Sequence, residues 1–372
     1  MPFRSKVYTA LAPVLRRSPK ALSAVRRANR TVDRAITAVA DHIPMIIRPD
    51  PRQLAIAITA QCNLSCTGCR YGRDFMVGSE LPLPKILEAI ADAGSCGFSE
   101  VRLYGGEPLL RKDLPEMVRA VVAHGMKPYV TTNAILLGKR IDALYEAGLR
   151  IINIGFYGVE QKYNNYVGRN ASFKRMEESI ATVRERYGTS IFMRINWLLM
   201  RPSCNIPDFD AAYRFAEKYD LKIQLDLVHY SLPYFTEGPD RELQFRSEDR
   251  PAVEAVVSEI LARKKKDPDR FIHSETAIRS IPDWVILGPA MRVPCDANRL
   301  VWVGADGTVQ LCYVTFRLGN LHEQRLSEMM FSEAHRKAAR GAFELDCPNC
   351  HCGYDGRVEK HGPSAKRYAP SP

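Results

Sequence analysis

Residues 54–73 read LAIAITAQCNLSCTGCRYGR, and this stretch decides how the rest of the chain is interpreted. It starts with a short apolar run that predicts one buried strand. Three cysteines follow directly, Cys62, Cys66 and Cys69, in the spacing C-x3-C-x2-C. Three thiolates on one tight loop cannot complete a tetrahedral metal site. They can hold three irons of a [4Fe–4S] cluster, because soft thiolates suit iron–sulfur chemistry. The fourth iron would then be open to a substrate or cofactor.

A second motif follows the next expected strand, at residues 100–104. It reads Gly105-Gly106-Glu107-Pro108, and glycines at such a turn allow close backbone approach. Alone, the cysteine spacing also fits a zinc knuckle or structural cysteines, and GGEP also fits an ordinary turn. The order strand, cysteine loop, helix, strand, GGEP resembles the radical S-adenosylmethionine (radical SAM) superfamily. The resemblance implies a fourth iron that binds the amino and carboxylate groups of SAM, with the GGEP backbone and glutamate facing the methionine amine.

One position departs from the family pattern. The family often has an aromatic residue just before the third cysteine, where this chain has Gly68. We expect Tyr71, two residues beyond the cysteine loop, to cover the adenine of SAM instead.

A strand–helix alternation continues from residue 54 to about residue 229. Expected helices at 84–93, 113–124 and 139–147 begin or end at proline or glycine. Short apolar runs lie at residues 101–104, 128–132, 151–156, 191–199 and 221–228. Strands joined by ten-residue helices predict a parallel sheet. Six such units resemble the partial (β/α)6 barrel of radical SAM enzymes, so the fold class is α/β with the active site at the carboxyl ends of the strands.

Several strands carry polar residues that the resemblance assigns to SAM or to the lumen. Thr132-Asn133 resembles the family's T-N-G element, and Gly155 and Tyr157 stand where serine and aspartate are common. Polar residues alternate on two later strands, Arg194 with Asn196 and Gln224 with Asp226, and should face the barrel lumen. We expect Arg194 to bind the SAM carboxylate; the alternative is a satisfied interior polar residue. Tyr230, Tyr234 and Phe235 are candidates for the pocket mouth or for simple packing.

The third informative region spans residues 295–352. Cys295 precedes an apolar run, Asp306-Gly307 predicts a hairpin turn, and Cys312 ends the second run. This spacing resembles the SPASM/twitch extension of radical SAM enzymes. A helix is expected at 326–340, before a cysteine-rich segment with three further cysteines, Cys347, Cys350 and Cys352. A small C-terminal β-hairpin/helix domain with an auxiliary [4Fe–4S] cluster is therefore expected, although zinc also accepts four thiolates.

The cysteine count limits this second site. Five thiolates cannot fully ligate two more clusters, so one auxiliary cluster is expected, with Cys352 spare or replacing a neighbour. The chain has ten cysteines in all, and Cys96 and Cys204 remain as ordinary buried thiols.

Charge is concentrated at the N-terminal end. The chain carries a net charge of +11, and residues 1–34 hold nine basic residues against one acid, Asp33. The remainder is nearly neutral, which argues against nucleic acid as a partner. Apolar residues recur at helical spacing after Pro19, preceded by an apolar group within residues 3–15. Three interpretations remain: a helix packed on the catalytic domain, a basic amphipathic helix on anionic lipid through residues 1–45, or a targeting peptide.

These features divide the chain into five parts: a basic amphipathic segment (1–50), a radical SAM core barrel (51–235), connecting helices (236–290), a SPASM/twitch-like domain (291–356) and a flexible tail (357–372). No apolar run approaches eighteen residues, so no segment is expected to span a bilayer. We place the protein in the cytoplasm or at the inner membrane face.

The resemblance implies an enzyme that reductively cleaves SAM to a 5′-deoxyadenosyl radical, which abstracts a hydrogen atom from a substrate C–H bond. An auxiliary [4Fe–4S] cluster would assist oxidation or coupling, and flavodoxin or ferredoxin would donate electrons. The substrate stays open between a ribosomally made peptide, a membrane lipid and a soluble small molecule such as a sugar. A non-catalytic iron–sulfur scaffold is the alternative outside enzymology.

Overall fold

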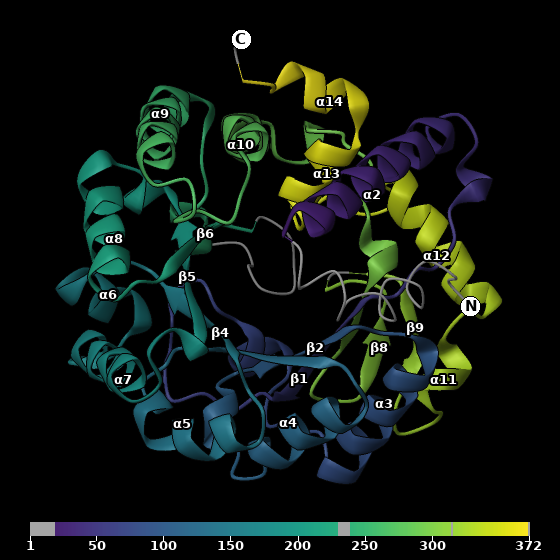
Figure 1. Ribbon diagram of the computed structural model, residues 1–372, viewed down its shortest axis with the longest axis horizontal. Helices are drawn as coiled ribbons and strands as arrows, with labels where there is room; N and C mark the ends of the chain where they lie inside the picture. Colours follow the sequence, from purple (N-terminus) through teal and green to yellow (C-terminus); the bar gives the residue numbers. More distant parts are fainter. Residues whose placement is uncertain (1–18, 230–238, 314, 371–372) are drawn as a thin grey trace.

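The structure, a computed structural model, describes residues 19–229, 239–313 and 315–370 (Figure 1). The apolar group within residues 3–15 and the candidate mouth residues Tyr230, Tyr234 and Phe235 lie outside these ranges.

Six parallel strands form the centre of the molecule, and consecutive strands are neighbours in the sheet. Buried apolar residues such as Leu103, Ile154 and Leu225 alternate along these strands with polar residues that line the central cavity. The strands are β1 (Gln53–Thr59), β2 (Glu100–Gly105), β3 (Lys127–Thr132), β4 (Ile151–Phe156), β5 (Phe192–Leu199) and β6 (Lys222–Leu227).

Helices lie on the outside of this curved sheet, as Figure 1 shows. They are α3 (Leu83–Cys96), α4 (Leu114–Ala123), α5 (Leu137–Glu146), α6 (Glu160–Val167), α7 (Ser172–Tyr187) and α8 (Ile206–Lys218). The expected α/β fold with a partial (β/α)6 barrel is confirmed.

The C-terminal hairpin extends the same sheet. Strand β7 (Leu300–Val303) pairs in parallel with β1, with Val301 opposite Leu54. Strands β8 (Thr308–Gln310) and β9 (Arg317–Asn320) then continue it antiparallel, giving nine strands in the order β6-β5-β4-β3-β2-β1-β7-β8-β9. The auxiliary domain therefore shares the sheet of the barrel.

The edge strand β6 is covered by segments from the C-terminal half. Phe271 forms a parallel bridge with Ile223. The Tyr354 hydroxyl donates to the Leu225 carbonyl at 3.2 Å, and His351 Nε2 lies 3.1 Å from the Leu227 carbonyl. Helices α9 (Arg250–Lys266) and α10 (Glu275–Leu287) support this side, and α10 packs against α13 (Tyr354–Lys360). The segment that carries the last cysteines is thereby seated on the open side of the barrel.

Two local expectations are corrected. The helix expected at 326–340 is divided into α11 (Leu326–Met329) and α12 (Glu333–Glu344), because Phe331 adopts a positive φ of 60° and Ser332 then caps α12. The expected flexible tail instead contains part of α13 and the helix α14 (Gly362–Arg367). Its last described turn is fixed because the Tyr368 hydroxyl donates to the Asp283 carboxylate at 2.5 Å.

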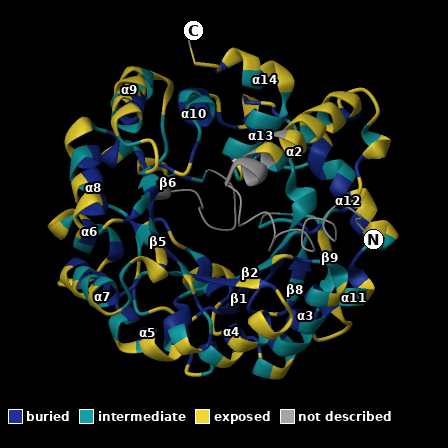
Figure 2. Cartoon of the chain, viewed as in Figure 1, coloured by how far each residue is buried: buried dark blue, intermediate teal, exposed yellow. Residues whose placement is uncertain are grey.

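The N-terminal helix α2 (Pro19–Ala40) lies against α13 and α14, and the short turn η1 (Pro44–Ile46) contacts α12. Ala40 and Ile47 are buried against Ala339 and Phe343 of α12. Most of the described side chains of α2 are nevertheless exposed, as Figure 2 shows.

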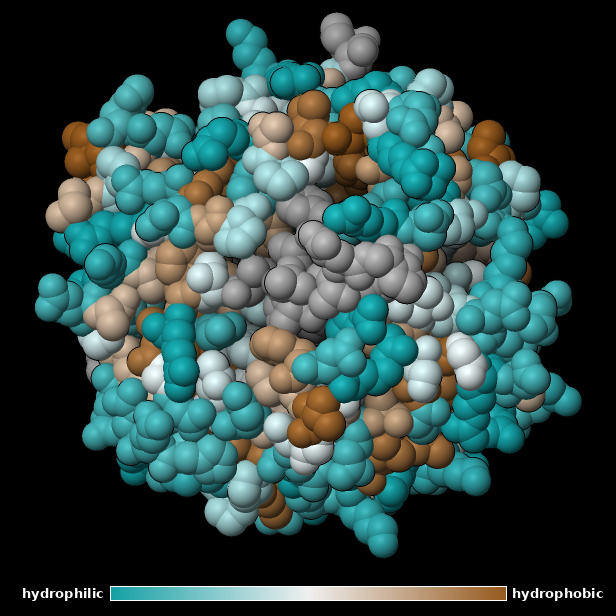
Figure 3. Space-filling view, turned by 180° about the vertical axis from the view of Figure 1, so that it is seen from behind, coloured by the Kyte–Doolittle hydropathy of each residue, from teal (hydrophilic) through white to brown (hydrophobic). Residues whose placement is uncertain are grey.

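On the opposite face of the molecule, hydrophobic residues form small groups within a mostly hydrophilic surface (Figure 3). Within the described ranges, none of the helices combines the length and apolar character needed to cross a membrane.

Candidate active site

The first cysteine loop follows β1 and is anchored to the end of α6. The Ser65 amide donates to the Val167 carbonyl at 3.1 Å, and the Thr67 amide donates to the Tyr166 carbonyl at 2.8 Å. Arg73 Nη2 donates to the Cys66 carbonyl at 2.7 Å from the other side. These contacts hold the loop open at the carboxyl end of β1.

The thiols of this loop lie close enough to influence one another. The pKa of Cys62 is raised to about 11, chiefly by burial and also by the charges of Glu107 and Cys69, although backbone amides oppose this rise. Burial and the neighbouring thiols also raise the pKa of Cys66. Binding of iron would therefore have to displace protons from these thiols. Three such thiols on one loop fit the donor set of a [4Fe–4S] cluster with an open iron.

The GGEP turn packs directly on the segment that precedes the cysteine loop. The Gly106 amide donates to the Thr59 carbonyl at 2.8 Å. A Cβ atom at Gly105, whose φ is 143°, would lie 2.2 Å from the Thr59 carbonyl oxygen, and one at Gly106 would lie 2.1 Å from that of Gln61. Glycine is therefore required at both positions by close backbone approach.

Glu107 has a different place from the one we expected. Its carboxylate is fully buried behind the turn and accepts hydrogen bonds from the Thr132 hydroxyl (2.6 Å), the Asn133 amide (2.8 Å) and the Leu109 amide (3.0 Å). Burial raises its pKa to about 7 against these donors. Glu107 thus ties the GGEP turn to the end of β3, and Pro108 is buried beside it.

Asn133 extends this connection to the cysteine loop. Its side-chain amide donates to the Asn63 side chain at 2.8 Å, and Arg169 Nη1 donates to the Asn63 carbonyl at 3.0 Å. The three segments that sequence motifs assign to SAM, namely the cysteine loop, GGEP and Thr132-Asn133, are therefore physically joined.

The expectation for Tyr71 is not supported by its position. Its side chain is 2% exposed, packs among Ala57, Met76 and Trp302, and its hydroxyl accepts from the Ala305 amide at 3.1 Å. A π-helical turn at Tyr71–Phe75 directs the ring toward β1 and β7.

A different aromatic pair lies near the first cysteines. The rings of Tyr157 and Tyr166 stack with centroids 4.4 Å apart, and both line the cavity that Cys66 also lines. A Cβ atom at Gly155 would lie 2.7 Å from the Tyr157 hydroxyl. The absence of a side chain at position 155 therefore makes room for the Tyr157 ring.

The second group of cysteines is assembled from three separate segments. Cys295 precedes β7, Cys312 follows β8, and the segment Cys347-Pro348-Asn349-Cys350-His351-Cys352 follows α12. The charges of Cys350, Cys312 and Cys295 all raise the pKa of Cys352, so these thiols lie near one another.

The thiol of Cys352 sits between two partners. It donates to Cys350, which is the largest cause of a Cys350 pKa lowered to about 5. Its sulfur also lies 3.4 Å from His229 Nε2. Five thiols from three segments fit a four-thiolate cluster with one thiol to spare.

A buried arginine organises the cysteine segment. The Arg357 side chain is 1% exposed and donates to the carbonyls of Cys350 and Val293 and to the Asn349 side chain at 3.0 Å. Its guanidinium also lies 4.7 Å from the centre of the Trp284 ring. Asn349 accommodates a positive φ of 52° between the two cysteines of C-x2-C.

Within residues 19–229, 239–313 and 315–370, no three side chains of His, Cys, Asp or Glu converge closely enough to hold a single metal ion. Cys204 is buried and Cys96 is half-buried, both apart from the two cysteine groups.

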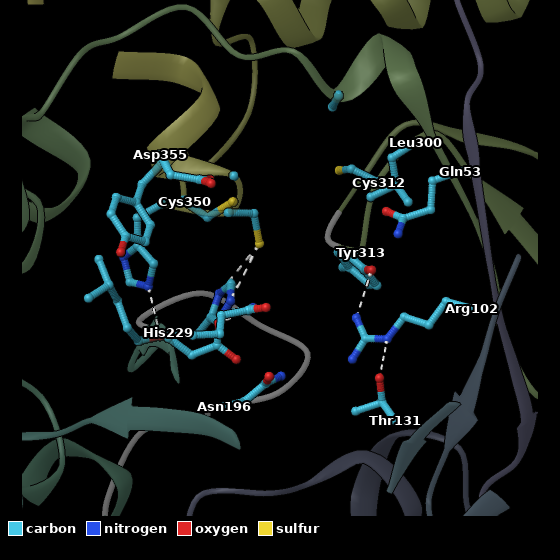
Figure 4. A pocket seen from close by; sticks show the side chains of 18 of the residues that line it. Gln53, Arg102, Thr131, Asn196, His229, Leu300, Cys312, Tyr313, Cys350 and Asp355 are labelled. Carbon is cyan, nitrogen blue, oxygen red and sulfur yellow. Dashed lines mark hydrogen bonds between the residues drawn. The ribbon is translucent and has the colours of Figure 1, made fainter. Parts of the chain in front are cut away.

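One cavity of about 760 Å³ connects the two cysteine groups. Cys66 and Cys69 line it from the first loop, and all five C-terminal cysteines line it from the other region. Figure 4 shows Cys350 and His229 on one side of it and Cys312 and Arg102 on the facing side. The expected lumen residues Arg194, Asn196, Gln224 and Asp226 also line it.

Several cavity residues were not found from sequence. Arg102, His229, Asp355 and Tyr313 line the cavity, yet each is a single polar or aromatic residue without a motif. Arg102 could have been found by the same period-two rule that found Arg194, because it alternates with Glu100 on β2. His229, Tyr313 and Asp355 enter through tertiary folding alone.

Comparison with protein families agrees with this geometry. The radical SAM superfamily profile matches residues 56–198, and the iron–sulfur cluster-binding domain called SPASM matches residues 295–352.

Among curated proteins, the GTP 3′,8-cyclase of Chlorobaculum tepidum is 29% identical over 171 residues, which cover 45% of this chain and 51% of that protein. The probable GTP 3′,8-cyclase of Methanosarcina acetivorans is 30% identical over 213 residues, covering 55% and 61%. The chain thus spans about half the length of the curated relatives it matches.

Two solved structures share the fold across most of the chain. Native anSMEcpe with bound AdoMet and Cp18Cys peptide is 16% identical with a TM-score of 0.62, covering 86% of this chain and 95% of that one. Streptococcus suis SuiB bound to the precursor peptide SuiA is 14% identical with a TM-score of 0.60, covering 81% and 69%. With both family profiles in the expected places, this chain belongs to the radical SAM superfamily and carries a SPASM-type iron–sulfur domain at residues 295–352.

Proposed function

We propose that this protein is a radical SAM enzyme that abstracts a hydrogen atom from a C–H bond of a substrate held in the cavity. The single observation that carries the proposal is that one cavity is lined both by Cys66 and Cys69 and by the C-terminal cysteines. A substrate in this cavity could meet the SAM-derived radical on one side and an electron acceptor on the other.

When bound, the [4Fe–4S] cluster of the first loop supplies the electron that cleaves SAM to methionine and a 5′-deoxyadenosyl radical. The residues of the chain bind and orient. Cys62, Cys66 and Cys69 would hold three irons, and Gly105 and Gly106 give the backbone room beside them. Glu107 and Asn133 fix the spacing of the surrounding segments through their hydrogen bonds.

The C-terminal cysteines would hold the auxiliary [4Fe–4S] cluster. Cys295, Cys312, Cys347 and Cys350 are the proposed ligands, and Cys352 is the spare thiol between Cys350 and His229. Arg357 positions the segment by bonding to the Cys350 carbonyl. An external donor such as flavodoxin or ferredoxin would supply the reducing electrons.

The test is the release of 5′-deoxyadenosine by anaerobically reconstituted and reduced protein. The enzyme should release 5′-deoxyadenosine from SAM, and the rate should rise with the membrane or soluble extract that contains its substrate. A non-catalytic iron–sulfur scaffold would hold both clusters, with iron and absorbance to match, yet release none. That result would overturn the proposed function.

A second observation favours a membrane surface as the place where the enzyme works. Helix α2 rests on the body through contacts such as Arg34 Nε to the Glu359 carbonyl at 2.9 Å and Arg299 Nη2 to Asp33 at 2.9 Å. Its apolar stripe faces away, because Ile36 is 39%, Val39 48% and Ile43 54% exposed. A helix that packed through its apolar stripe would bury these residues.

Basic residues surround this stripe. Arg30, Arg34 and Arg48 are exposed on the same segment, and Arg336 and Lys337 are exposed on the neighbouring α12. An exposed apolar stripe bordered by cations suits the anionic surface of a bilayer, since apolar burial and charge attraction add there. We therefore propose that residues 19–46 contact anionic lipid, and that the substrate is a lipid or a membrane-associated molecule. A peptide, which is bound in both of the similar solved structures, is the alternative.

Co-sedimentation with vesicles tests this contact. The protein should bind phosphatidylcholine vesicles that contain phosphatidylglycerol, and Val39→Asp should weaken binding at least fivefold. Val122→Asp is the matched control, because Val122 is 44% exposed on the unrelated helix α4. Absence of binding to anionic vesicles, or equal loss in both variants, would refute the membrane contact and favour a soluble peptide or sugar.

A further inference from the structure

The inward face of β5 carries two polar side chains at the wall of the cavity. Arg194 and Asn196 are two residues apart, so both point into the lumen and lie roughly 7 Å apart along the strand. Neither side chain is used by the cysteine groups or by the segments that motifs assign to SAM.

Among the described residues, Arg194 is a half-buried cation without a contacting counterion. Its Nε donates to the Asn153 side chain at 2.7 Å, and within the described part of the chain no carboxylate lies within 4 Å of its guanidinium. Burial lowers the pKa of Arg194. Tyr129, Asp226 and Glu100 oppose this shift electrostatically, without contacting the guanidinium.

The nearest carboxyl groups do not neutralise this cation by contact. The Asp226 carboxylate accepts from the Gln224 amide at 2.7 Å on the neighbouring strand. Glu100 lies at the start of β2, and burial raises its pKa, which favours the neutral carboxylic acid. A half-buried cation in such a place is stabilised when an anion binds beside it.

Asn196 supplies an independent sign of a missing partner. Its side chain is 8% exposed, and its Oδ1 atom has no hydrogen-bond partner among the residues that the structure describes. Buried polar atoms are normally paired, because an unpaired one costs free energy. A hydroxyl or amino group of a ligand in the cavity would satisfy this acceptor.

Arg102 brings a second positive charge to the same lumen. Its Nε donates to the Thr131 hydroxyl and its Nη1 to the Tyr313 hydroxyl, both at 3.0 Å, as Figure 4 shows. The guanidinium also lies 4.3 Å from the centre of the Tyr104 ring. Its charge acts on Arg194 and lowers the pKa of that group, so the two cations lie near each other.

The position of Arg194 separates it from the expected SAM carboxylate site. Arg194 lies five residues before Leu199, the last residue of β5, which is roughly 16 Å of strand. Gly105 and the first cysteine loop instead stand at the carboxyl ends of β2 and β1. Arg194 therefore lies deep in the barrel.

We propose that Arg194 and Asn196 form the polar anchor for the substrate, in which Arg194 binds an oxyanion and Asn196 accepts a hydrogen bond from a hydroxyl or amino group about 7 Å away. This inference rests on the proposed function. It specifies the substrate class: an anionic molecule whose carboxylate or phosphate lies deep in the barrel and whose reacting C–H bond lies toward the first cysteines. The planar guanidinium can donate two parallel hydrogen bonds to either kind of oxyanion.

Anion binding to the reconstituted holoenzyme with saturating SAM tests the anchor. The probes are inorganic phosphate and succinate, measured separately by titration calorimetry, so that the two arms distinguish phosphate from carboxylate. The variants are Arg194→Gln, Arg194→Lys and Asn196→Ala. Arg186→Gln is the matched control, since Arg186 is an exposed arginine paired with Asp142 outside the cavity.

At least one probe should bind the wild type, and its dissociation constant should rise at least tenfold in Arg194→Gln, less in Arg194→Lys, and not at all in Arg186→Gln. The affinity for SAM should be the same in all of them, which also shows that each variant is folded.

Equal anion affinity in wild type and Arg194→Gln would overturn the proposal. So would a loss of SAM affinity in Arg194→Gln, because that result would assign Arg194 to the SAM carboxylate. Arg194-dependent anion binding in a protein that releases no 5′-deoxyadenosine would refute the proposed function and leave this anchor standing.

Discussion

The two cysteine regions of this protein are built in different ways. The first takes Cys62, Cys66 and Cys69 from eight consecutive residues, and its loop is anchored by a few backbone bonds to α6. The second gathers cysteines from segments up to 57 residues apart, on both sides of a hairpin and after α12. The first is local in sequence, and the second exists only because the chain folds back on β6.

Because of this difference, we expect the two regions to respond differently to substitutions. A local loop keeps its thiols together even when distant packing is weakened, so its function depends on the thiols themselves. An assembled site loses its geometry when any supporting contact is lost, because no short segment contains enough ligands. The predictions below test this contrast.

The largest expected effect separates the two cysteine groups. Cys66→Ala should abolish release of 5′-deoxyadenosine, at least 100-fold, because the SAM-binding cluster loses a ligand. Cys350→Ala should retain SAM cleavage while substrate turnover is lost. Each variant should also lose about half of its iron. Iron content, deoxyadenosine and substrate conversion are measured on the same reconstituted samples.

Retained SAM cleavage in Cys66→Ala would contradict the assignment of the first loop. Cys352→Ala is the control within the second region, and it should keep its full iron content if Cys352 is the spare thiol.

The second effect concerns the support of the assembled site. Arg357→Met should remove the hydrogen bonds to the Cys350 and Val293 carbonyls and to Asn349. Leaving these buried acceptors unpaired should lower the free energy of unfolding by about 3 kcal/mol. Denaturant unfolding measures this change, and the auxiliary cluster should be lost before the first one. Simultaneous loss of both clusters would show that the two regions are not independent.

Glu107 tests the corresponding support of the first region. The pKa of Glu107 is about 7 in the folded state and near 4.3 in the unfolded state. The protonated carboxyl group therefore stabilises the folded state fully below about pH 4.3, and this stabilisation is lost as the pH rises through 7. The wild type should therefore lose on the order of 3 kcal/mol from this group between pH 4 and pH 8.

The Glu107→Gln variant cannot titrate, so its melting temperature should vary less over this range. An identical pH profile in both proteins would show that the buried carboxyl does not titrate as expected.

The smallest effect comes from His335 on α12, beside the second region. Its ring is fully buried, burial lowers its pKa to about 4, and its Nδ1 accepts from the Phe331 amide at 3.1 Å. The folded form is therefore neutral, and stability is full above the unfolded value near 6.5 and falls as pH decreases. At pH 5 the loss should be roughly 1–2 kcal/mol. Thermal unfolding of wild type and His335→Gln at pH 5 and pH 7.5 measures it, and a difference of the opposite sign would exclude this explanation.

Sequence reasoning located both cysteine groups, the barrel and the lumen residues of β5 and β6, because each is marked by a spacing or a period. It did not foresee the hydrogen bonds that Glu107 and Tyr71 make within the protein, since nothing in a motif says which way a side chain turns. It also left the packing of the N-terminal helix open. An apolar stripe looks the same whether it meets the protein body or faces outward, and only the contacts of α2 with α13 and α14 distinguish these cases.

By itself, then, the sequence determined the local chemistry of this protein: three thiolates on a loop, glycines where backbones must touch, and alternating polar residues along buried strands. These features depend on neighbours within a few residues. The tertiary structure alone decided that residues 347–354 cover the edge of β6, that one cavity joins the two cysteine groups, and that His229 and Asp355 line it. Such placements depend on contacts between residues far apart in the chain, which no spacing along the sequence records.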